Sequence, residues 1–155
     1  MGVVYVLRHA KAGTRERWPG DDIDRPLTKN GWLQAHALAD RLADAGAAAV
    51  LLSSPYVRCM QTLEPLAERL GTKVVADDRL TEGVPFEPLL ALVESTPTGS
   101  VLCSHGDIIP DLIGALHRRG AHLTTDADWR KAAVWVLHRE RHKIDSLACW
   151  PPPDS

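Results

Sequence analysis

The chain has 155 residues, of which 45% are hydrophobic and 25% charged, and its formal net charge is −2. This composition is typical of a soluble globular protein, and the length suits one domain with a sizeable core. The near-neutral charge and the lack of a basic run argue against binding to nucleic acid or to a membrane surface. No apolar stretch reaches the roughly 18 residues of a membrane helix.

Cysteine usage indicates a reducing compartment. The three cysteines, Cys59, Cys103 and Cys149, are odd in number and include no CxxC pair. This argues against a disulfide framework. No signal-like segment precedes the first predicted strand, so we expect a cytoplasmic protein.

The first third of the chain predicts a strand, a long loop and a helix. Residues 2–7 form a short, continuous apolar run, the pattern of a strand buried on both faces. Residues 11–25 are polar and interrupted by Gly and Pro, and loops of this length tend to be functional. Thr28 has the character of an N-cap for a helix that ends at Gly46.

The middle of the chain alternates strands and helices. Residues 47–52 and 73–76 predict two further strands, and a helix between them is expected to begin at Pro55 and end near Leu70. Residues 87–95 predict a short helix.

The last part predicts a strand over 100–103, a helix over 109–117 and a terminal hairpin formed by 132–138 and 144–150. Together these elements predict an α/β fold: a three-layer α/β/α sandwich with a mainly parallel central sheet and one antiparallel C-terminal edge. We expect a single domain over residues 1–150 and a disordered tail over 151–155.

Five chemically active residues, at four places in the chain, lie at or beyond the ends of predicted strands. Arg8 and His9 end the first strand, His105 follows the strand at 100–103, and Arg58 falls in the first turn of a helix. Glu82 lies in the loop after the third strand. Because ligands of open α/β sheets bind at the carboxyl ends of the strands, these side chains are expected to share one pocket.

The residue types fit phosphoryl transfer without a metal. A neutral imidazole can attack a phosphoryl group and form a phosphohistidine. Arg8, Arg58 and a cationic His105 would neutralise the phosphoryl oxygens, and Glu82 could protonate the leaving group and then activate water. Cys103, His105 and Asp107 alternate along the chain and suggest metal ligands, but no second cluster at ligand spacing accompanies them, so we expect no metal and no cofactor.

Three motifs, taken together, resemble the histidine phosphatase (phosphoglycerate mutase-like) superfamily. They are Leu7-Arg8-His9-Ala10, the segment 53–62 with Arg58, and Ser104-His105-Gly106-Asp107. The small size and the segment 25–31 resemble the SixA branch of phosphohistidine phosphatases. The resemblance implies His9 as nucleophile, Arg8, Arg58 and His105 as phosphate ligands, and Glu82 as the acid.

Two features depart from the family's pattern. Ala10 stands where Gly often follows the nucleophile, and Glu82 supplies a carboxylate that SixA-type proteins often lack. The second departure keeps phosphomonoesters open as substrates, so the expected partner is a phosphohistidine-bearing protein or a phosphorylated small molecule.

Three alternatives accompany the SixA-like interpretation. They are a phosphatase for a small metabolite or nucleotide, a non-catalytic module that binds a phosphorylated ligand, and, less favoured, a phosphoglycerate mutase. The loop 11–25 and the segment 81–86 are expected to set specificity, and Trp18 could touch a substrate. The basic residues Lys11, Arg15 and Arg17 either attract a second acidic group or keep the loop solvated, and we favour solvation.

Overall fold

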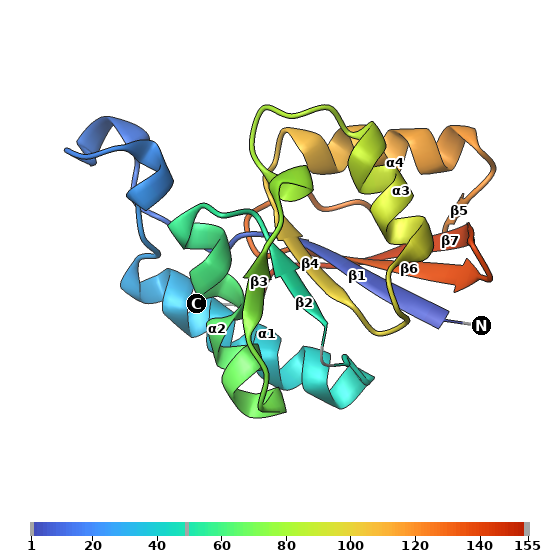
Figure 1. Ribbon diagram of the computed structural model, residues 1–155, viewed down its shortest axis with the longest axis horizontal. Coiled ribbons are helices and arrows are strands. Elements are labelled where there is room, and N and C mark those ends of the chain that lie inside the picture. Colours follow the sequence, from blue (N-terminus) through green and yellow to red (C-terminus); the bar gives the residue numbers. More distant parts are fainter. Residues whose placement is uncertain (1, 49, 154–155) are drawn as a thin grey trace.

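The computed structural model describes residues 2–48 and 50–153. Within these residues a seven-stranded sheet has the order β3-β2-β4-β1-β6-β7-β5 (Figure 1). The strands β3, β2, β4 and β1 are parallel to one another, β6 is antiparallel to both β1 and β7, and β5 is parallel to β7. The predicted fold class, a mainly parallel sheet with an antiparallel C-terminal part, is confirmed.

The elements follow one another along the chain as the sequence pattern indicates. The strands are β1 (Gly2–Arg8), β2 (Leu51–Ser53), β3 (Val74–Ala76), β4 (Val101–Ser104), β5 (His122–Leu123), β6 (Val134–Glu140) and β7 (Lys143–Trp150). The α-helices are α1 (Lys29–Ala45), α2 (Val57–Leu70), α3 (Glu87–Ser95) and α4 (Ile108–Arg118). Three short 3-10 helices, at Arg15–Arg17, Asp22–Asp24 and Asp78–Leu80, lie in loops.

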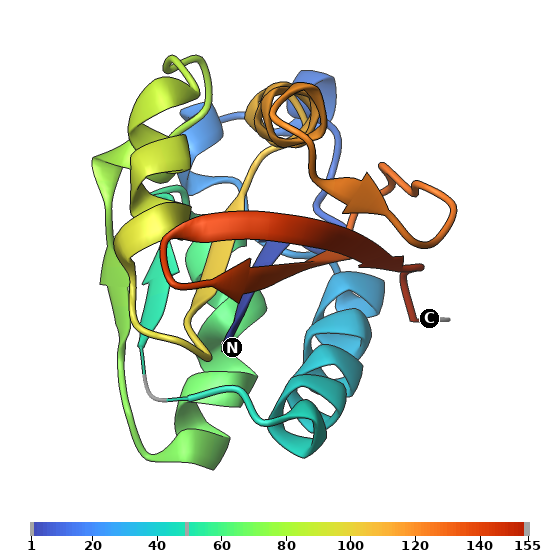
Figure 2. The same ribbon diagram turned by 90° about the vertical axis from the view of Figure 1, so that its right-hand side faces the viewer.

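Helices cover both faces of the sheet, so the central strands are buried on both sides (Figures 1 and 2). In β1, Val4 and Val6 pack into the core under α3 and α4, whereas Tyr5 and Leu7 pack into the core under α1 and α2. This alternation explains why β1 is a continuous apolar run. It also leaves the carboxyl ends of the central strands as the place where polar side chains can gather.

Several predicted boundaries are wrong by a few residues. Helix α2 begins at Val57 with Tyr56 as its N-cap, two residues later than the predicted start at Pro55. Strand β6 begins at Val134 because Ala132 has a φ of 72°, which extended backbone does not allow. Strand β5 was not predicted because two residues carry no periodic pattern.

Two sequence expectations fall partly on residues that the structure does not describe. The second strand was expected to begin before Ala49, which lies outside the described residues, and β2 is observed from Leu51. Residues 154–155 of the expected tail also lie outside the described part. By contrast, the predicted N-cap is confirmed, because the Thr28 side chain accepts a hydrogen bond from Gly31 N at 3.0 Å.

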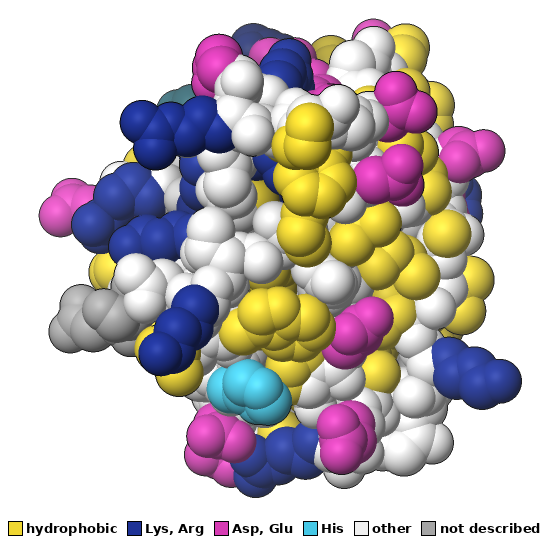
Figure 3. Space-filling model, turned by 90° about the vertical axis from the view of Figure 1, so that its left-hand side faces the viewer, with side chains coloured by type: hydrophobic (Ala, Val, Ile, Leu, Met, Phe, Trp, Pro, Cys, Tyr) yellow, Lys and Arg dark blue, Asp and Glu magenta, His cyan; other side chains and the backbone are white. Residues whose placement is uncertain are grey.

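The long loop after β1 forms two 3-10 turns rather than an unstructured segment. It projects from one end of the molecule, and on that face Lys and Arg side chains gather along one side with Asp and Glu side chains nearby (Figure 3). Among the described residues, no helix combines the length and the apolar character that crossing a bilayer requires.

Candidate active site

Strand register brings the two predicted histidines together. In the parallel pair β1 and β4, Arg8 lies opposite Ser104, so the residues that follow them leave the sheet side by side. His9 N donates to Ser104 O at 3.1 Å, and the His9 and His105 ring centroids are 5.6 Å apart. The sheet thus places both imidazoles at one edge, as expected for a ligand site.

The two ring nitrogens of His9 face different partners, Nδ1 the backbone of Ala10 and Nε2 the Arg58 side chain. Its Nδ1 lies 2.8 Å from Ala10 O, and a carbonyl can only accept, so Nδ1 carries the hydrogen and Nε2 carries the lone pair. Burial, and then the charges of Arg58, His105 and Arg8, hold the pKa of His9 well below 6.5, against the opposing effect of the Ala10 hydrogen bond. The imidazole is therefore neutral near pH 7, the form that a nucleophile requires.

Arg58 is a charged side chain that is only 1% exposed. It is the second residue of α2, and its Nε lies 3.4 Å from His9 Nε2. Its other nitrogens bind Asp22 O at 2.9 Å, Asp22 Oδ2 at 3.1 Å and Glu82 Oε2 at 3.4 Å. These contacts fix the guanidinium group beside His9 Nε2.

Asp22 is a site-supporting residue that the sequence analysis missed. Its carboxylate accepts hydrogen bonds from Arg25 Nε at 2.9 Å and from Arg58. Burial would raise the pKa of this carboxyl group, but the hydrogen bonds and charges of Arg25 and Arg58 outweigh burial and lower it to about 2. No pattern distinguishes Asp22 from the other acidic residues of its loop, so only the fold reveals its role.

Two buried nitrogens at this edge lack a hydrogen-bond partner within the described residues: Arg8 Nε and His105 Nδ1. The other nitrogen of His105, Nε2, lies 2.8 Å from Ser54 Oγ and 3.5 Å from Cys59 Sγ. Buried polar atoms are normally satisfied. Unsatisfied nitrogens on a cation and an imidazole fit a site that an anion completes.

These side chains line a cavity of about 380 Å³. All five predicted site residues border it, namely Arg8, His9, Arg58, Glu82 and His105, as do Asp107 and Lys131. Lys131 is not among the predicted site residues, since nothing in the neighbouring sequence marks it.

Glu82 lies at the rim of the cavity, with its side chain 30% exposed. It contacts Arg15 at 3.1 Å in addition to Arg58. Two other carboxylates, Glu16 and Asp107, border the same cavity, whereas Asp77 pairs with Arg79.

Asp107 does not use its carboxylate to cap α4. Its side chain makes no cap hydrogen bond and instead accepts from Gly83 N at 2.8 Å. This bond holds the segment that carries Glu82 against the His105 loop. Trp18, unlike Asp107, does not border the cavity, and its indole Nε1 donates to Asp21 O at 2.8 Å within its own loop.

Among the described residues, no three His, Cys, Asp or Glu side chains are grouped as metal ligands would be. The site is a polar cavity with cations on its walls and a neutral histidine among them. Fold and site together have the features of a phosphate-binding α/β domain.

The chain belongs to the histidine phosphatase superfamily (branch 1), which it matches over residues 4–84, just over half its length. The matched region includes Arg8, His9, Arg58 and Glu82, whereas His105 lies beyond it.

Known relatives cover the rest of the chain. It is 35% identical to the 8-oxo-(d)GTP phosphatase of Mycolicibacterium smegmatis, over 97% of this chain and 48% of that protein. The chain therefore spans about half the length of this relative. A structure from Agrobacterium tumefaciens that bears the name phosphohistidine phosphatase SixA is 25% identical, with a TM-score of 0.75 over 98% of this chain and 99% of that one. A SixA protein histidine phosphatase complexed with tungstate, 20% identical, shares the fold with a TM-score of 0.74 over 98% of this chain and 96% of that one.

Proposed function

We propose that this chain is a metal-independent phosphatase in which His9 is the nucleophile. The observation that carries the proposal is the state of the His9 ring. Nδ1 is engaged by Ala10 O, the lowered pKa keeps the ring neutral, and Nε2 lies 3.4 Å from the Arg58 guanidinium group. A phosphoryl group bound by Arg58 would therefore be held next to the lone pair that attacks it.

The reaction has two displacement steps. In the first, His9 Nε2 forms a bond to phosphorus, the bond to the leaving oxygen breaks, and that oxygen takes a proton from Glu82. In the second, water attacks phosphorus, Glu82 takes the water's proton, and the bond to His9 breaks, which releases phosphate. Arg8, Arg58 and His105 bind the phosphoryl oxygens in both steps.

For the substrate, we infer a nucleotide or a related phosphorylated small molecule. The support is the 35% identity to an 8-oxo-(d)GTP phosphatase along nearly the whole chain, together with the carboxylate of Glu82 at the cavity. Oxygen leaving groups need a proton more than the nitrogen leaving group of a phosphohistidine does, so a carboxylic acid fits an ester or anhydride substrate.

A phosphohistidine-bearing protein is the second candidate. The SixA structure with 25% identity and a TM-score of 0.75 favours it, as does the SixA-like segment 25–31. The two substrate classes use the same nucleophile and phosphate ligands, so a rate comparison between phosphohistidine protein and nucleotides separates them.

The nucleophile is tested with p-nitrophenyl phosphate in excess EDTA. We expect turnover by the wild type, none by His9→Ala, and unchanged turnover by His36→Ala, which alters an exposed histidine of α1. Rapid acid-free quenching and mass analysis should show one phosphoryl group on His9. Activity lost to EDTA, or retained without His9, would contradict the proposed mechanism.

A further inference from the structure

Lys131 lies where two cavities meet. One is the cavity of about 380 Å³ that contains His9 and Arg58, and the other is a broad depression of about 1040 Å³. Arg8 and Lys131 border both of them. A ligand that fills the first cavity and continues into the second would therefore pass between these two cations.

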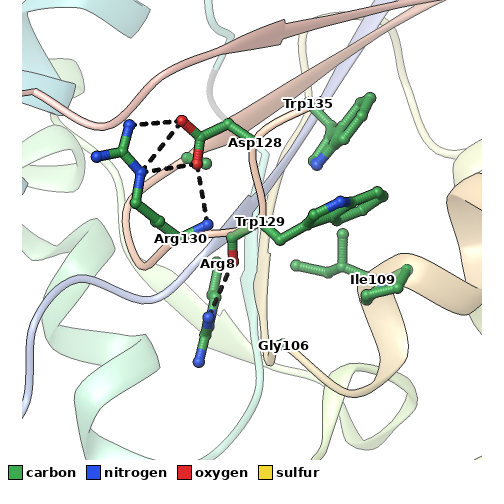
Figure 4. Close-up of a pocket in the computed structure, with 9 residues that line it drawn as sticks. Arg8, Gly106, Ile109, Asp128, Trp129, Arg130 and Trp135 are labelled. Carbon is green, nitrogen blue, oxygen red and sulfur yellow. Dashed lines mark hydrogen bonds and ion pairs between the residues drawn. The ribbon is translucent and has the colours of Figure 1, made fainter. Parts of the chain in front are cut away.

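The backbone holds Lys131 firmly in this position. Ala132, the next residue, has a φ of 72°, which costs about 1 kcal/mol or more for a residue other than Gly. Its N–H donates to both Arg8 O and His9 O, each at 3.1 Å. The segment before Lys131 is held as well, because Arg8 Nη1 donates to Trp129 O at 2.9 Å (Figure 4). The backbone strain is thus maintained beside the nucleophile, as is common at ligand sites.

The charged groups that shift the pKa of Lys131 are all cations, although Glu16, Glu82 and Asp107 also border the first cavity. Within the described residues Lys131 forms no hydrogen bond or ion pair, and it is only partly exposed. Burial lowers the pKa of its ammonium group, and so do the neighbouring charges of Arg8, Arg25, Arg58 and Lys11. No described Asp or Glu borders the 1040 Å³ depression, whereas Lys11 and Arg130 do.

Such an arrangement favours a ligand with more negative charge than one phosphoryl group. Arg8 and Arg58 already serve the scissile phosphoryl group in the proposed function. Lys131 is additional to them, and like charges held close together are destabilising until an anion binds between them. The neutral polar side chains of Thr28, Asn30 and Gln34 border the same depression and could accommodate the rest of a ligand.

We propose that Lys131 binds a second phosphate group of the substrate, next to the one that His9 attacks, so that the site prefers nucleoside diphosphates or comparable compounds to monophosphates. This inference rests on the proposed function and names its substrate class. It revises the interpretation of Lys11 as a residue that only solvates its loop, because Lys11 borders the same depression.

Binding of inorganic pyrophosphate and inorganic phosphate tests the inference without turnover. Calorimetry is carried out in the His9→Ala background with Lys131 unchanged, Lys131→Met, Lys131→Arg, and the control Lys73→Met, which alters an exposed lysine before β3. We expect pyrophosphate to bind at least about tenfold more tightly than phosphate, the worth of one charge-assisted hydrogen bond.

Lys131→Met should remove most of the preference for pyrophosphate and leave the affinity for phosphate within about threefold of its value with Lys131 unchanged. Lys131→Arg should retain most of the preference. Lys73→Met should change neither affinity. The inference would be overturned if the two anions bound with equal affinity. It would also be overturned if Lys131→Met lowered the affinities for both anions equally while circular dichroism showed native folding.

The corresponding activity measurement separates this inference from the proposed function. Wild type and Lys131→Met are compared on GDP, GMP and p-nitrophenyl phosphate, and we expect KM for GDP alone to rise about tenfold in the variant. Turnover of p-nitrophenyl phosphate through His9 with no pyrophosphate preference would overturn the inference and leave the function standing. A pyrophosphate preference that depends on Lys131, with no turnover of any phosphate compound, would overturn the function alone.

Discussion

Gly106 lies directly against the guanidinium group of Arg8. A Cβ atom at residue 106 would approach Arg8 Cζ to 2.7 Å and Arg8 Nε to 2.8 Å, closer than real contacts allow. The glycine of the Ser-His-Gly-Asp segment therefore leaves the space that the guanidinium group of Arg8, a residue of β1, occupies. Arg8 Nε is also one of the unsatisfied buried nitrogens, so its position decides how the site receives an anion.

Gly106→Ala should displace Arg8 and weaken phosphate binding. We expect KM for p-nitrophenyl phosphate to rise about tenfold or more, since one charged contact is lost, while the melting temperature changes by only a few degrees. Gly114→Ala in α4 is the control, because its added Cβ would meet only the flexible end of Arg118. An unchanged KM in Gly106→Ala would show that Arg8 does not bind the phosphoryl group.

The pH dependence of activity should reflect the lowered pKa of His9. Because that pKa is well below 6.5, His9 remains neutral as the pH falls through the usual histidine range. We therefore expect kcat/KM for p-nitrophenyl phosphate to fall little near pH 6.5, because His9 is not yet protonated there. The acidic limb of the pH profile of kcat/KM should lie at lower pH. NMR titration of the His9 ring gives an independent reading, and a midpoint near 6.5 would contradict this expectation.

The same pKa affects stability. Below pH 6.5 the unfolded chain takes up a proton at residue 9 that the folded chain does not, so the free energy of unfolding falls as the pH falls. The contribution is at most about 1.4 kcal/mol per pH unit. Chemical denaturation at several pH values should show a shallower decline between pH 6.5 and 5 for His9→Gln than for the wild type. Parallel curves would mean that His9 keeps an ordinary pKa in the folded protein.

Leaving-group dependence should identify the general acid. Glu82→Gln removes the proton donor, so the rate should fall about 10²-fold or more with a nucleoside monophosphate but far less with p-nitrophenyl phosphate, whose leaving group needs little protonation. Asp107→Asn is the matched comparison, since Asp107 borders the same cavity but its carboxylate binds Gly83 N. The reverse pattern between the two variants would assign the acid role to Asp107.

Asp22 should matter to catalysis through Arg58. Asp22→Asn weakens the hydrogen bonds that hold Arg58 and Arg25, and we expect KM to rise several-fold to about tenfold while kcat changes less. Asp24→Asn, an exposed neighbour in the same 3-10 turn, is the control. Equal effects of the two substitutions would mean that the loop responds to net charge and not to the contact with Arg58.

The sequence could predict the sheet and the five candidate site residues because both depend on local signals. Short, continuous apolar runs mark β1 and β4, and the polar residues that follow such runs lie at the carboxyl edge of the sheet. In contrast, Asp22 and Lys131 reach the site through tertiary structure. Asp22 lies in a loop of ordinary polar composition. Lys131 is positioned by the positive φ of Ala132, and an alanine in the sequence does not predict such a conformation.

Asp107 shows a further limit of local interpretation. An acidic residue just before a helix is a good candidate for an N-cap, yet its carboxylate contacts Gly83, 24 residues away along the chain. A local pattern indicates which partners are available nearby but cannot show that a more distant backbone N–H will come within reach.

The central position of β1 has a consequence for how the chain reaches its folded state. β1 pairs with β4 on one side and β6 on the other, so its neighbours are synthesised roughly a hundred residues after it. During synthesis both edges of this apolar strand therefore remain unpaired until β4 and β6 have been made. Unpaired apolar strands promote misassociation of nascent chains. Refolding should be slow for a domain of this size, because the parallel pairing closes a long loop. Enzymatic competence should appear only with that late step, since His9 and His105 are adjacent solely through it.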